Sequence, residues 1–151
     1  MKKTIFQWVI YILLFIWQLP QNLLSLIMIL IFKLSKKNVE FSIYKDEIYV
    51  WIIRWYNGVS LGNFILLDKE YYEHNLDTIN HEYGHSIQSK ILGPLYLPII
   101  GVLSGGWNLI DRLLRRCCKT WTYNKAYKVY YSMPWEHTAD LLGGVKRNYN
   151  F

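Results

Sequence analysis

The strongest constraint on this chain is the pentapeptide HEYGH at positions 81–85, which lies within a segment, 76–92, whose pattern is typical of a helix. Residues four apart on a helix share one face, so His81 and His85 would present two imidazole nitrogens to one point. This spacing is the one with which a helix binds zinc, and Glu82 would then reach a water on the metal and take its proton. The chain must therefore fold around this helix and bring a further ligand to it.

Local signals predict where this helix begins and ends. Asp77 is expected to be the N-cap, and Gly93-Pro94 is expected to stop the helix.

A catalytic zinc site needs a third protein ligand and one position open to water. The chain has four histidines, and of the two outside the pentapeptide we expect His74 to lie on the surface. The segment 134–140 offers a carboxylate instead, because Pro134 can open a helix on which Glu136 and Asp140 lie four residues apart. A glutamate there could complete the metal site, and the aspartate one turn later could accept the second ring N–H of a ligand histidine.

The two motifs together, H-E-x-x-H and then E-x-x-x-D, resemble the gluzincin class of zinc metallopeptidases, to which thermolysin belongs. The resemblance implies that His81, His85 and Glu136 bind Zn²⁺, that Glu82 is the general base and that Asp140 supports a ligand histidine. It covers these two motifs alone, and the interval between them, about 50 residues, is longer than in thermolysin.

A longer pattern also resembles a group of small bacterial zincin-like domains. It consists of H-E-Y-G-H-x-x-Q, G-P-L-Y-L-P and P-W-E-x-x-A-D-x-x-G-G, in that order along the chain. This resemblance pairs the motifs and implies a bacterial protein, but it says little about the substrate.

The first 37 residues are expected to anchor the chain in a membrane, and residues 38–151 to form the zincin-like domain. Two apolar runs, 5–19 and 23–34, are separated by Pro20, Gln21 and Asn22. Read as one helix, the segment would be about 42 Å long, so it would tilt or kink in a hydrocarbon core of roughly 30 Å. Read as a hairpin, each arm of about 18–22 Å is too short to cross, and the segment would be re-entrant or interfacial. Both topologies stay open.

Composition supports a lipid partner. The chain is 52% hydrophobic and 17% aromatic with a net charge of +6, which suits a protein at an anionic membrane surface. The basic residues are dispersed and form no nucleic-acid recognition motif, so we expect no nucleic-acid partner. We expect a bacterial cytoplasmic membrane, with the catalytic domain facing the cytoplasm. The adjacent pair Cys117 and Cys118 is expected to be reduced, because neighbouring cysteines bond each other only with strain.

Between the two regions the pattern changes to short strands, which predicts an α+β fold with a small antiparallel sheet. Strands are expected at 39–43, 48–55 and 62–67, with a turn at Asn57-Gly58. An exposed sheet edge beside the metal helix could hold an extended substrate by strand addition. The residues expected to form that edge and contact the substrate are Phe64, Ile65, Leu66 and Leu67.

The remaining segments carry weaker signals. Proline and glycine interrupt the apolar run 93–107, so it does not predict a spanning helix. The segment 107–116 is amphipathic, and the pattern of 119–133 predicts no particular structure. Gly143-Gly144 is expected to end the second motif helix, and the tail Lys146-Arg147 is expected to fray. Candidate donors to an oxyanion are Tyr83, Tyr130, Tyr131 and His137, although the ring of His137 is expected to point away from the metal.

These features predict a membrane-associated zinc metallopeptidase acting on a peptide or protein. One alternative is a small membrane protein whose zinc site is structural or vestigial and which serves as a binding or immunity-type partner. Another is a metal-dependent hydrolase that acts on something other than a peptide.

Overall fold

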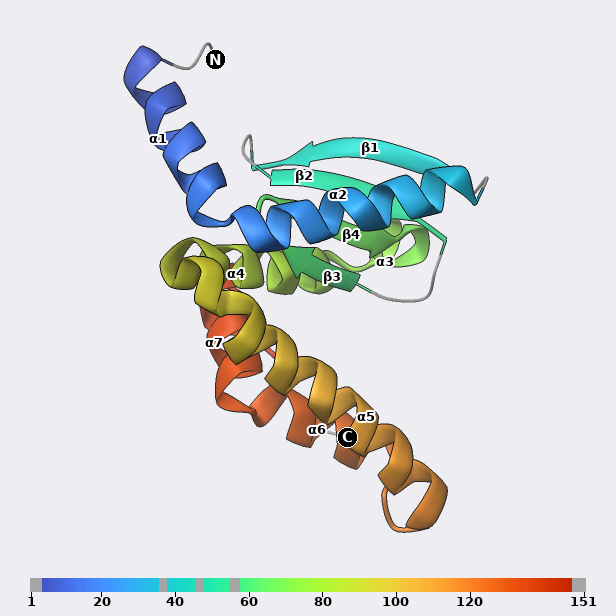
Figure 1. Cartoon of the computed structure of the whole chain (residues 1–151). Helices are drawn as coiled ribbons and strands as arrows, with labels where there is room; N and C mark the ends of the chain where they lie inside the picture. Colours follow the sequence, from blue (N-terminus) through green and yellow to red (C-terminus); the bar gives the residue numbers. More distant parts are fainter. Residues whose placement is uncertain (1–3, 36–37, 46–47, 55–57, 148–151) are drawn as a thin grey trace.

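The structure is a computed structural model, and it describes residues 4–35, 38–45, 48–54 and 58–147. The described chain has a mixed α+β architecture in which helices lie on both sides of a small sheet (Figure 1). Its first half contains α1 (Ile5–Trp17), α2 (Leu19–Leu34), β1 (Val39–Tyr44), β2 (Ile48–Ile53), β3 (Gly58–Leu61), β4 (Phe64–Asp68) and α3 (Lys69–His74). Its second half contains α4 (Leu76–Leu92), the short turns η1 (Gly93–Leu95) and η2 (Leu97–Gly101), α5 (Val102–Cys117), α6 (Tyr123–Ser132) and α7 (Pro134–Gly143).

The sheet is mixed, so the prediction of a purely antiparallel sheet is wrong. The strand order is β1-β2-β4-β3, and the central pair β2 and β4 is parallel. The cause is the strand β3, which the sequence pattern did not reveal. After β2 the chain crosses to the far side, forms β3 and returns through a tight turn at Gly62-Asn63 to lay β4 between them.

The turn falls at Gly62 because the backbone there needs a positive φ of 67°. The following N–H, of Asn63, donates to Oδ1 of Asn22 at 2.8 Å, which fixes the turn against α2. Of the predicted turn at Asn57-Gly58, Asn57 lies outside the described residues and Gly58 is the first residue of β3.

Both faces of the sheet are buried. On one face Val50, Ile65 and Leu67 pack with Ile79 of α4, and on the other Ile53, Phe64 and Leu66 pack with Ile29 of α2. Burial on both faces explains why β4 is apolar at four successive positions instead of alternating. The sheet therefore fixes α4 on one side and the N-terminal helices on the other.

The start of α4 is capped by the residue that precedes it, and its end is capped by residues from a distant part of the chain. At its start the side chain of Asn75, and not that of the predicted Asp77, accepts a hydrogen bond from the backbone N–H of Thr78. Its end at Gly93 agrees with the predicted stop, and Gly93 has a φ of 54°. The indole of Trp17 donates to the carbonyl of Lys90, and Gln21 donates to that of Gly93. The N-terminal helices thus satisfy carbonyls that the helix itself leaves free.

No helix in the described part of the chain is both long and apolar enough to span a membrane alone. Two bent pairs of helices meet the length and composition test together: α1 with α2, bent by 82°, and the segment Leu76–Leu95 with Leu97–Cys117, bent by 112°.

The inner side of the α1–α2 bend is polar. Gln18, Gln21, Asn22 and Ser25 are fully buried, although they belong to the most apolar segment of the chain. Ser25 donates to the carbonyl of Leu61, and Gln18 donates to the side chain of Asn63. These bonds connect the N-terminal helices to the β3–β4 hairpin, across the boundary expected at residues 37 and 38.

Candidate metal centre

Two glycines let α4 and α7 approach so closely that their functional side chains meet. A Cβ on Gly84 would collide with the carbonyl oxygen of Ala139 in α7, and one on Gly143 would collide with the carbonyl oxygen of Asn80 in α4. The helix α7 begins at Pro134, as predicted, and ends with Gly144 in the left-handed conformation. Backbone contact between the helices is thus part of the site's construction.

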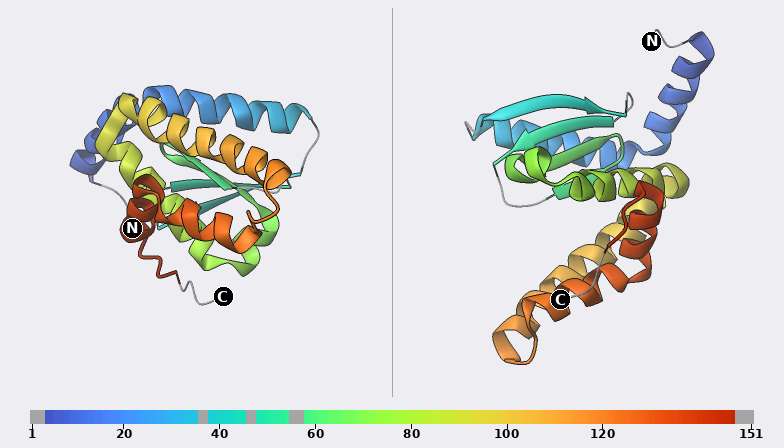
Figure 2. Two further views of the ribbon diagram at one scale, coloured as in Figure 1. Left: turned by 90° about the horizontal axis from the view of Figure 1, so that it is seen from below. Right: turned by 180° about the vertical axis from the view of Figure 1, so that it is seen from behind.

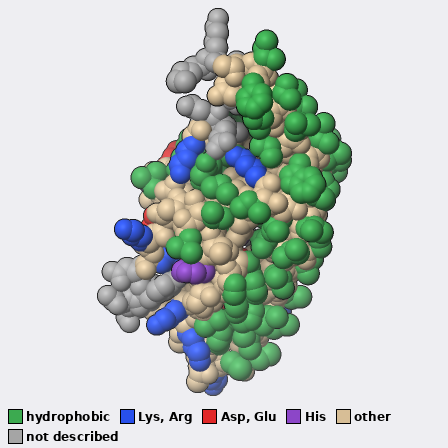
Figure 3. All heavy atoms as spheres, turned by 90° about the vertical axis from the view of Figure 1, so that its left-hand side faces the viewer, with side chains coloured by type: hydrophobic (Ala, Val, Ile, Leu, Met, Phe, Trp, Pro, Cys, Tyr) green, Lys and Arg blue, Asp and Glu red, His purple; other side chains and the backbone are tan. Residues whose placement is uncertain are grey.

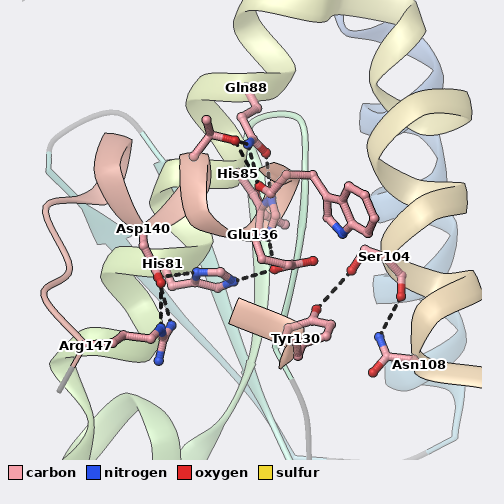
Figure 4. A network of polar contacts seen from close by, with 12 residues as sticks. His81, His85, Gln88, Ser104, Asn108, Tyr130, Glu136, Asp140 and Arg147 are labelled. Atoms are coloured by element: carbon pink, nitrogen blue, oxygen red, sulfur yellow. Dashed lines mark hydrogen bonds and ion pairs between the residues drawn. The ribbon is translucent and has the colours of Figure 1, made fainter. Parts of the chain in front are cut away.

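This contact brings together the three predicted ligands from motifs far apart in sequence. Oε2 of Glu136 lies 3.1 Å from Nε2 of His81 and 3.1 Å from Nε2 of His85 (Figure 4). All three side chains are buried, and their ligand atoms lie within 4.8 Å of one another. The group could hold a metal ion.

The outer nitrogens of both imidazoles are hydrogen-bonded to acceptors. Nδ1 of His81 lies 2.7 Å from Oδ1 of Asp140, the contact predicted from the E-x-x-x-D motif. Nδ1 of His85 lies 2.7 Å from Oε1 of Gln88. The amide of Gln88 can adopt one orientation only, because its nitrogen donates to the carbonyl oxygen of Trp135 at 2.8 Å. Both histidines must therefore carry their hydrogen on Nδ1 when neutral.

It follows that three acceptors point at one another. The Nε2 lone pairs of the two neutral rings meet the carboxylate oxygen of Glu136 in a buried space, and such an arrangement needs a cation or shared protons. The second oxygen of Glu136, Oε1, is buried and has no hydrogen-bond partner among the described residues. Two imidazoles and one carboxylate, with both rings fixed from behind, are ligands that zinc accepts and could hold a metal ion here. The residues present therefore fit the expected metal.

The electrostatics of the metal-free site are consistent with a proton in place of the cation. Burial alone would lower the pKa of His81, but hydrogen bonds to Asp140 and Glu136 outweigh it and raise the pKa to about 9. Burial alone would raise the pKa of Glu136, yet the two histidines bring it well below its ordinary value. The site thus attracts positive charge.

Glu82 lies beside the ligand group but does not belong to it. Its side chain is buried, and burial raises its pKa above the ordinary value, opposed by the charges of His81 and His85. A Cβ on Gly58 of β3 would lie 2.7 Å from Oε1 of Glu82, so the strand approaches this carboxylate closely because it has no side chain there. A carboxylate with a raised pKa next to a metal site is suited to proton transfer.

A cavity of about 660 Å³ gives access to the three residues His81, Glu82 and His85. Among the predicted oxyanion donors, Tyr130 and Tyr131 line this cavity. Tyr83 instead packs against the core beside Tyr44, and His137 is exposed to solvent. The structure therefore reduces the four candidates to the two tyrosines of α6, a helix that the sequence pattern did not reveal.

The predicted substrate edge is wrong in its position. Phe64, Ile65, Leu66 and Leu67 belong to β4, which is buried between β2 and β3 and has hydrogen-bonded neighbours on both sides. The edge strand beside the site is β3, whose four residues all line the cavity. Both this error and the error in sheet topology arise because the sequence pattern did not predict β3, which pairs with the outer side of β4 and makes β4 a central strand.

Two functional contacts were missed by the sequence reasoning. Gln88 lies three residues after His85, a spacing that places it on the same side of the helix and could have indicated its role. Arg147, expected to fray, instead binds Asp140 with two hydrogen bonds and lies over the ring of Tyr131. The helical spacing rule does not link Arg147 to Asp140, because α7 ends before Gly144, which has a left-handed conformation, and the chain changes direction between the two residues. His74 is exposed, as predicted.

Comparison with protein-family models, with curated proteins and with solved structures finds no match to this chain.

Proposed function

We propose that this protein is a membrane-associated zinc metallopeptidase of gluzincin type. The observation that supports this most directly is the convergence of His81, His85 and Glu136 on one point, with Glu82 next to them at the same cavity. A purely structural metal site has four protein ligands and no open position. Here three ligands and an accessible cavity favour catalysis over a structural role.

Zinc held by these three residues would supply a coordinated water of lowered pKa and a Lewis acid for a substrate carbonyl. Glu82 accepts the proton of the attacking water and then donates it to the amine that leaves when the peptide bond breaks. The raised pKa of Glu82 suits both steps, since a carboxylate that binds a proton more readily is a better base and can still release it.

The tyrosines of α6 are the candidates for stabilising negative charge on the substrate oxygen. Burial and the nearby charge of Glu136 raise the pKa of Tyr130, and burial also raises that of Tyr131. Both phenols therefore keep their hydrogens at neutral pH and can donate. The hydroxyl of Tyr130 lies 3.0 Å from that of Ser104 in α5, which orients it across the cavity (Figure 4).

The strand β3 is the candidate binding edge for an extended peptide. It borders the cavity along its whole length, and Gly58 at its start adjoins Glu82. The carbonyls of Ser60 and Leu61 already accept hydrogen bonds from Tyr96 and Ser25, so we expect an extended peptide to lie beside this strand and run past Glu82 without pairing with its whole length.

The decisive experiment combines metal analysis with proteolysis of a mixed-sequence peptide library. We expect Glu82→Gln to retain zinc and to lose about 10²–10⁴-fold in cleavage rate, because it removes proton transfer but no ligand. Glu136→Gln should lose zinc as well as activity. Glu73→Gln, on the exposed helix α3, is the matched control and should change neither.

Two other results would contradict the proposal. Zinc binding without cleavage of any peptide by the unaltered protein would favour a binding or immunity-type role. Cleavage that survives Glu82→Gln would exclude the mechanism described above.

A further inference from the structure

The helix α5 is amphipathic in the reverse sense to a helix of a soluble protein. One side lines the catalytic cavity and is polar or small, with Gly101 just before the helix followed by Ser104, Gly105, Asn108, Asp111 and Arg115. The other side is apolar and points outward, and Leu109 is 61% exposed and Leu113 50% exposed. A soluble helix buries its apolar side, so this arrangement calls for an apolar environment outside the protein.

The helix α2 repeats the pattern. Its inner side carries the buried polar residues Gln21, Asn22 and Ser25 and, further along, the buried Ile29 that packs on the sheet. Its outer side exposes Leu23, Leu24, Leu26, Ile27, Leu30 and Ile31. Two helices far apart in the sequence therefore both direct polar residues inward and large apolar residues outward. An apolar environment around the protein explains the exposed apolar sides of both helices.

The apolar sides of these helices form one continuous face. The helices α1, α2 and α5 lie on the same side of the molecule in Figures 1 and 2, and hydrophobic side chains cover that side in Figure 3. Lys33 is the single charged residue within α1 and α2, and the C-terminal half of α5 carries Arg112 and Arg116. An apolar face with cations near its ends is complementary to a bilayer with anionic headgroups.

The catalytic cavity borders this same face. Met28 of α2 lines it on one side, and Ile100 of η2 and Ser104 of α5 line it on the other. The two helices that are apolar on the outside thus also form two edges of the cavity that contains Glu82. A substrate bound along β3 would lie between them.

We infer that α1, α2 and α5 seat the protein in a lipid bilayer with the catalytic cavity at the membrane surface, so that the substrate is a polypeptide segment held at that surface. The placement in the membrane depends only on the exposed apolar sides of these helices. The substrate class also rests on the proposed peptidase function.

The seating is tested without any reference to activity. Full-length protein with Cys117 and Cys118 replaced by serine receives one environment-sensitive NBD fluorophore, through either Leu109→Cys or Glu73→Cys. The vesicles contain equal parts of phosphatidylethanolamine and phosphatidylglycerol, and some acyl chains carry nitroxide. We expect nitroxide to quench the label at 109 and aqueous iodide to quench the label at 73, which is on α3 at the back of the molecule (Figure 2).

Quenching of the label at 109 by iodide would overturn the seating. Protection of that label from both quenchers would overturn it too, because a second copy of the chain would then cover the face.

The substrate class is tested with a molecular ruler. A mixed-sequence peptide library is supplied free, coupled to a phospholipid headgroup through a spacer of a few atoms, or coupled through a long polyethylene glycol spacer. With the zinc-loaded protein in the same vesicles, we expect cleavage of the short-spacer form at least about tenfold faster than that of the free form. Cleavage of the long-spacer and free forms alone would place the cavity away from the surface and overturn the inference, while the peptidase function would stand. If no form is cleaved, the peptidase proposal and the substrate class both fail, and the fluorophore result still decides the seating.

Discussion

The guanidinium group of Arg147 binds both carboxylate oxygens of Asp140, with Nε 2.6 Å from Oδ2 and Nη2 2.9 Å from Oδ1. A third nitrogen, Nη1, donates to the hydroxyl of Tyr127 at 2.6 Å. Since Asp140 in turn orients the ring of His81, the position of one ligand depends on a cation beyond the end of α7. Arg147 is therefore a positioning residue. Burial would raise the pKa of Asp140, but the hydrogen bonds with His81 and then with Arg147 outweigh it and lower that pKa.

Replacement of Arg147 should weaken metal binding without removing a ligand. We expect Arg147→Met to lower zinc affinity about 10-fold, within the range of 10–100-fold seen for residues that orient a ligand from behind. Competition with a chromophoric chelator measures the affinity. Lys146→Met, one residue earlier and exposed, is the control and should leave it unchanged. Equal affinities in both variants would show that Asp140 holds His81 without help.

A methyl group at Gly84 should force α4 and α7 apart. Because its Cβ would collide with the carbonyl oxygen of Ala139, we expect Gly84→Ala to destabilise the fold by about 1–3 kcal/mol and to separate Glu136 from the histidines. Thermal unfolding in detergent and zinc content after dialysis measure the two effects.

The same change at Gly106 is the matched control for Gly84→Ala. A Cβ there meets nothing within 4 Å, and alanine favours a helix. Gly106→Ala should thus be neutral or stabilising, and a similar loss in both variants would contradict the close contact of the helices.

Zinc affinity should rise between about pH 6.5 and pH 9. The pKa of His81 in the metal-free fold is about 9 against an ordinary 6.5, so protonation stabilises that fold fully below pH 6.5. This stabilisation is lost as the pH rises through 9. A metal ion must displace the same proton, so affinity should increase by at most about tenfold per pH unit. The difference in unfolding temperature between zinc-loaded and metal-free protein should widen across this interval. A constant difference would mean that no proton is displaced.

The N-terminal helices should tolerate apolar substitution on one side only. Asn22→Leu would leave the buried N–H of Asn63 without an acceptor, at a cost of about 1–3 kcal/mol. Leu23→Ala, next to it on the exposed side, should cost much less. Protease resistance of the protein in detergent gives the comparison. If the segment were only a hydrophobic anchor, Asn22→Leu would be more stable than Leu23→Ala, which would contradict this prediction.

The metal centre could be predicted because its parts are local. Spacing of four residues on a helix places His81 with His85, and Glu136 with Asp140, whatever the rest of the chain does. The remaining requirement, that the two helices meet, followed from the number of ligands that a metal needs. Gly84 within the first motif shows how they meet, but its role depends on a contact with Ala139 that the sequence does not display.

The sheet could not be predicted in the same way, because strand order is decided by contacts between distant residues. The short strand β3 has few β-branched residues, and it becomes an edge only because Gly62 and Asn22 place the turn after it. The prediction of an accessible edge at the apolar run of β4 is wrong, because four successive apolar residues are typical of a strand covered on both faces. Hydropathy likewise revealed the apolar exterior of α2, whereas the hydrogen-bond partners of its buried Gln21, Asn22 and Ser25 lie far away in the sequence.

The last turn of α4 is closed by residues from the start of the chain. Trp17 and Gln21 bind the carbonyls of Lys90 and Gly93, which lie more than 70 positions later. During synthesis α1 and α2 leave the ribosome well before α4 does. Until α4 has formed, the side chains of Trp17 and Gln21 lack the carbonyl groups to which they donate. Such long-range closure is slow compared with the folding of a single helix. Completion of the candidate metal centre therefore depends on two helices that are synthesised well before α4.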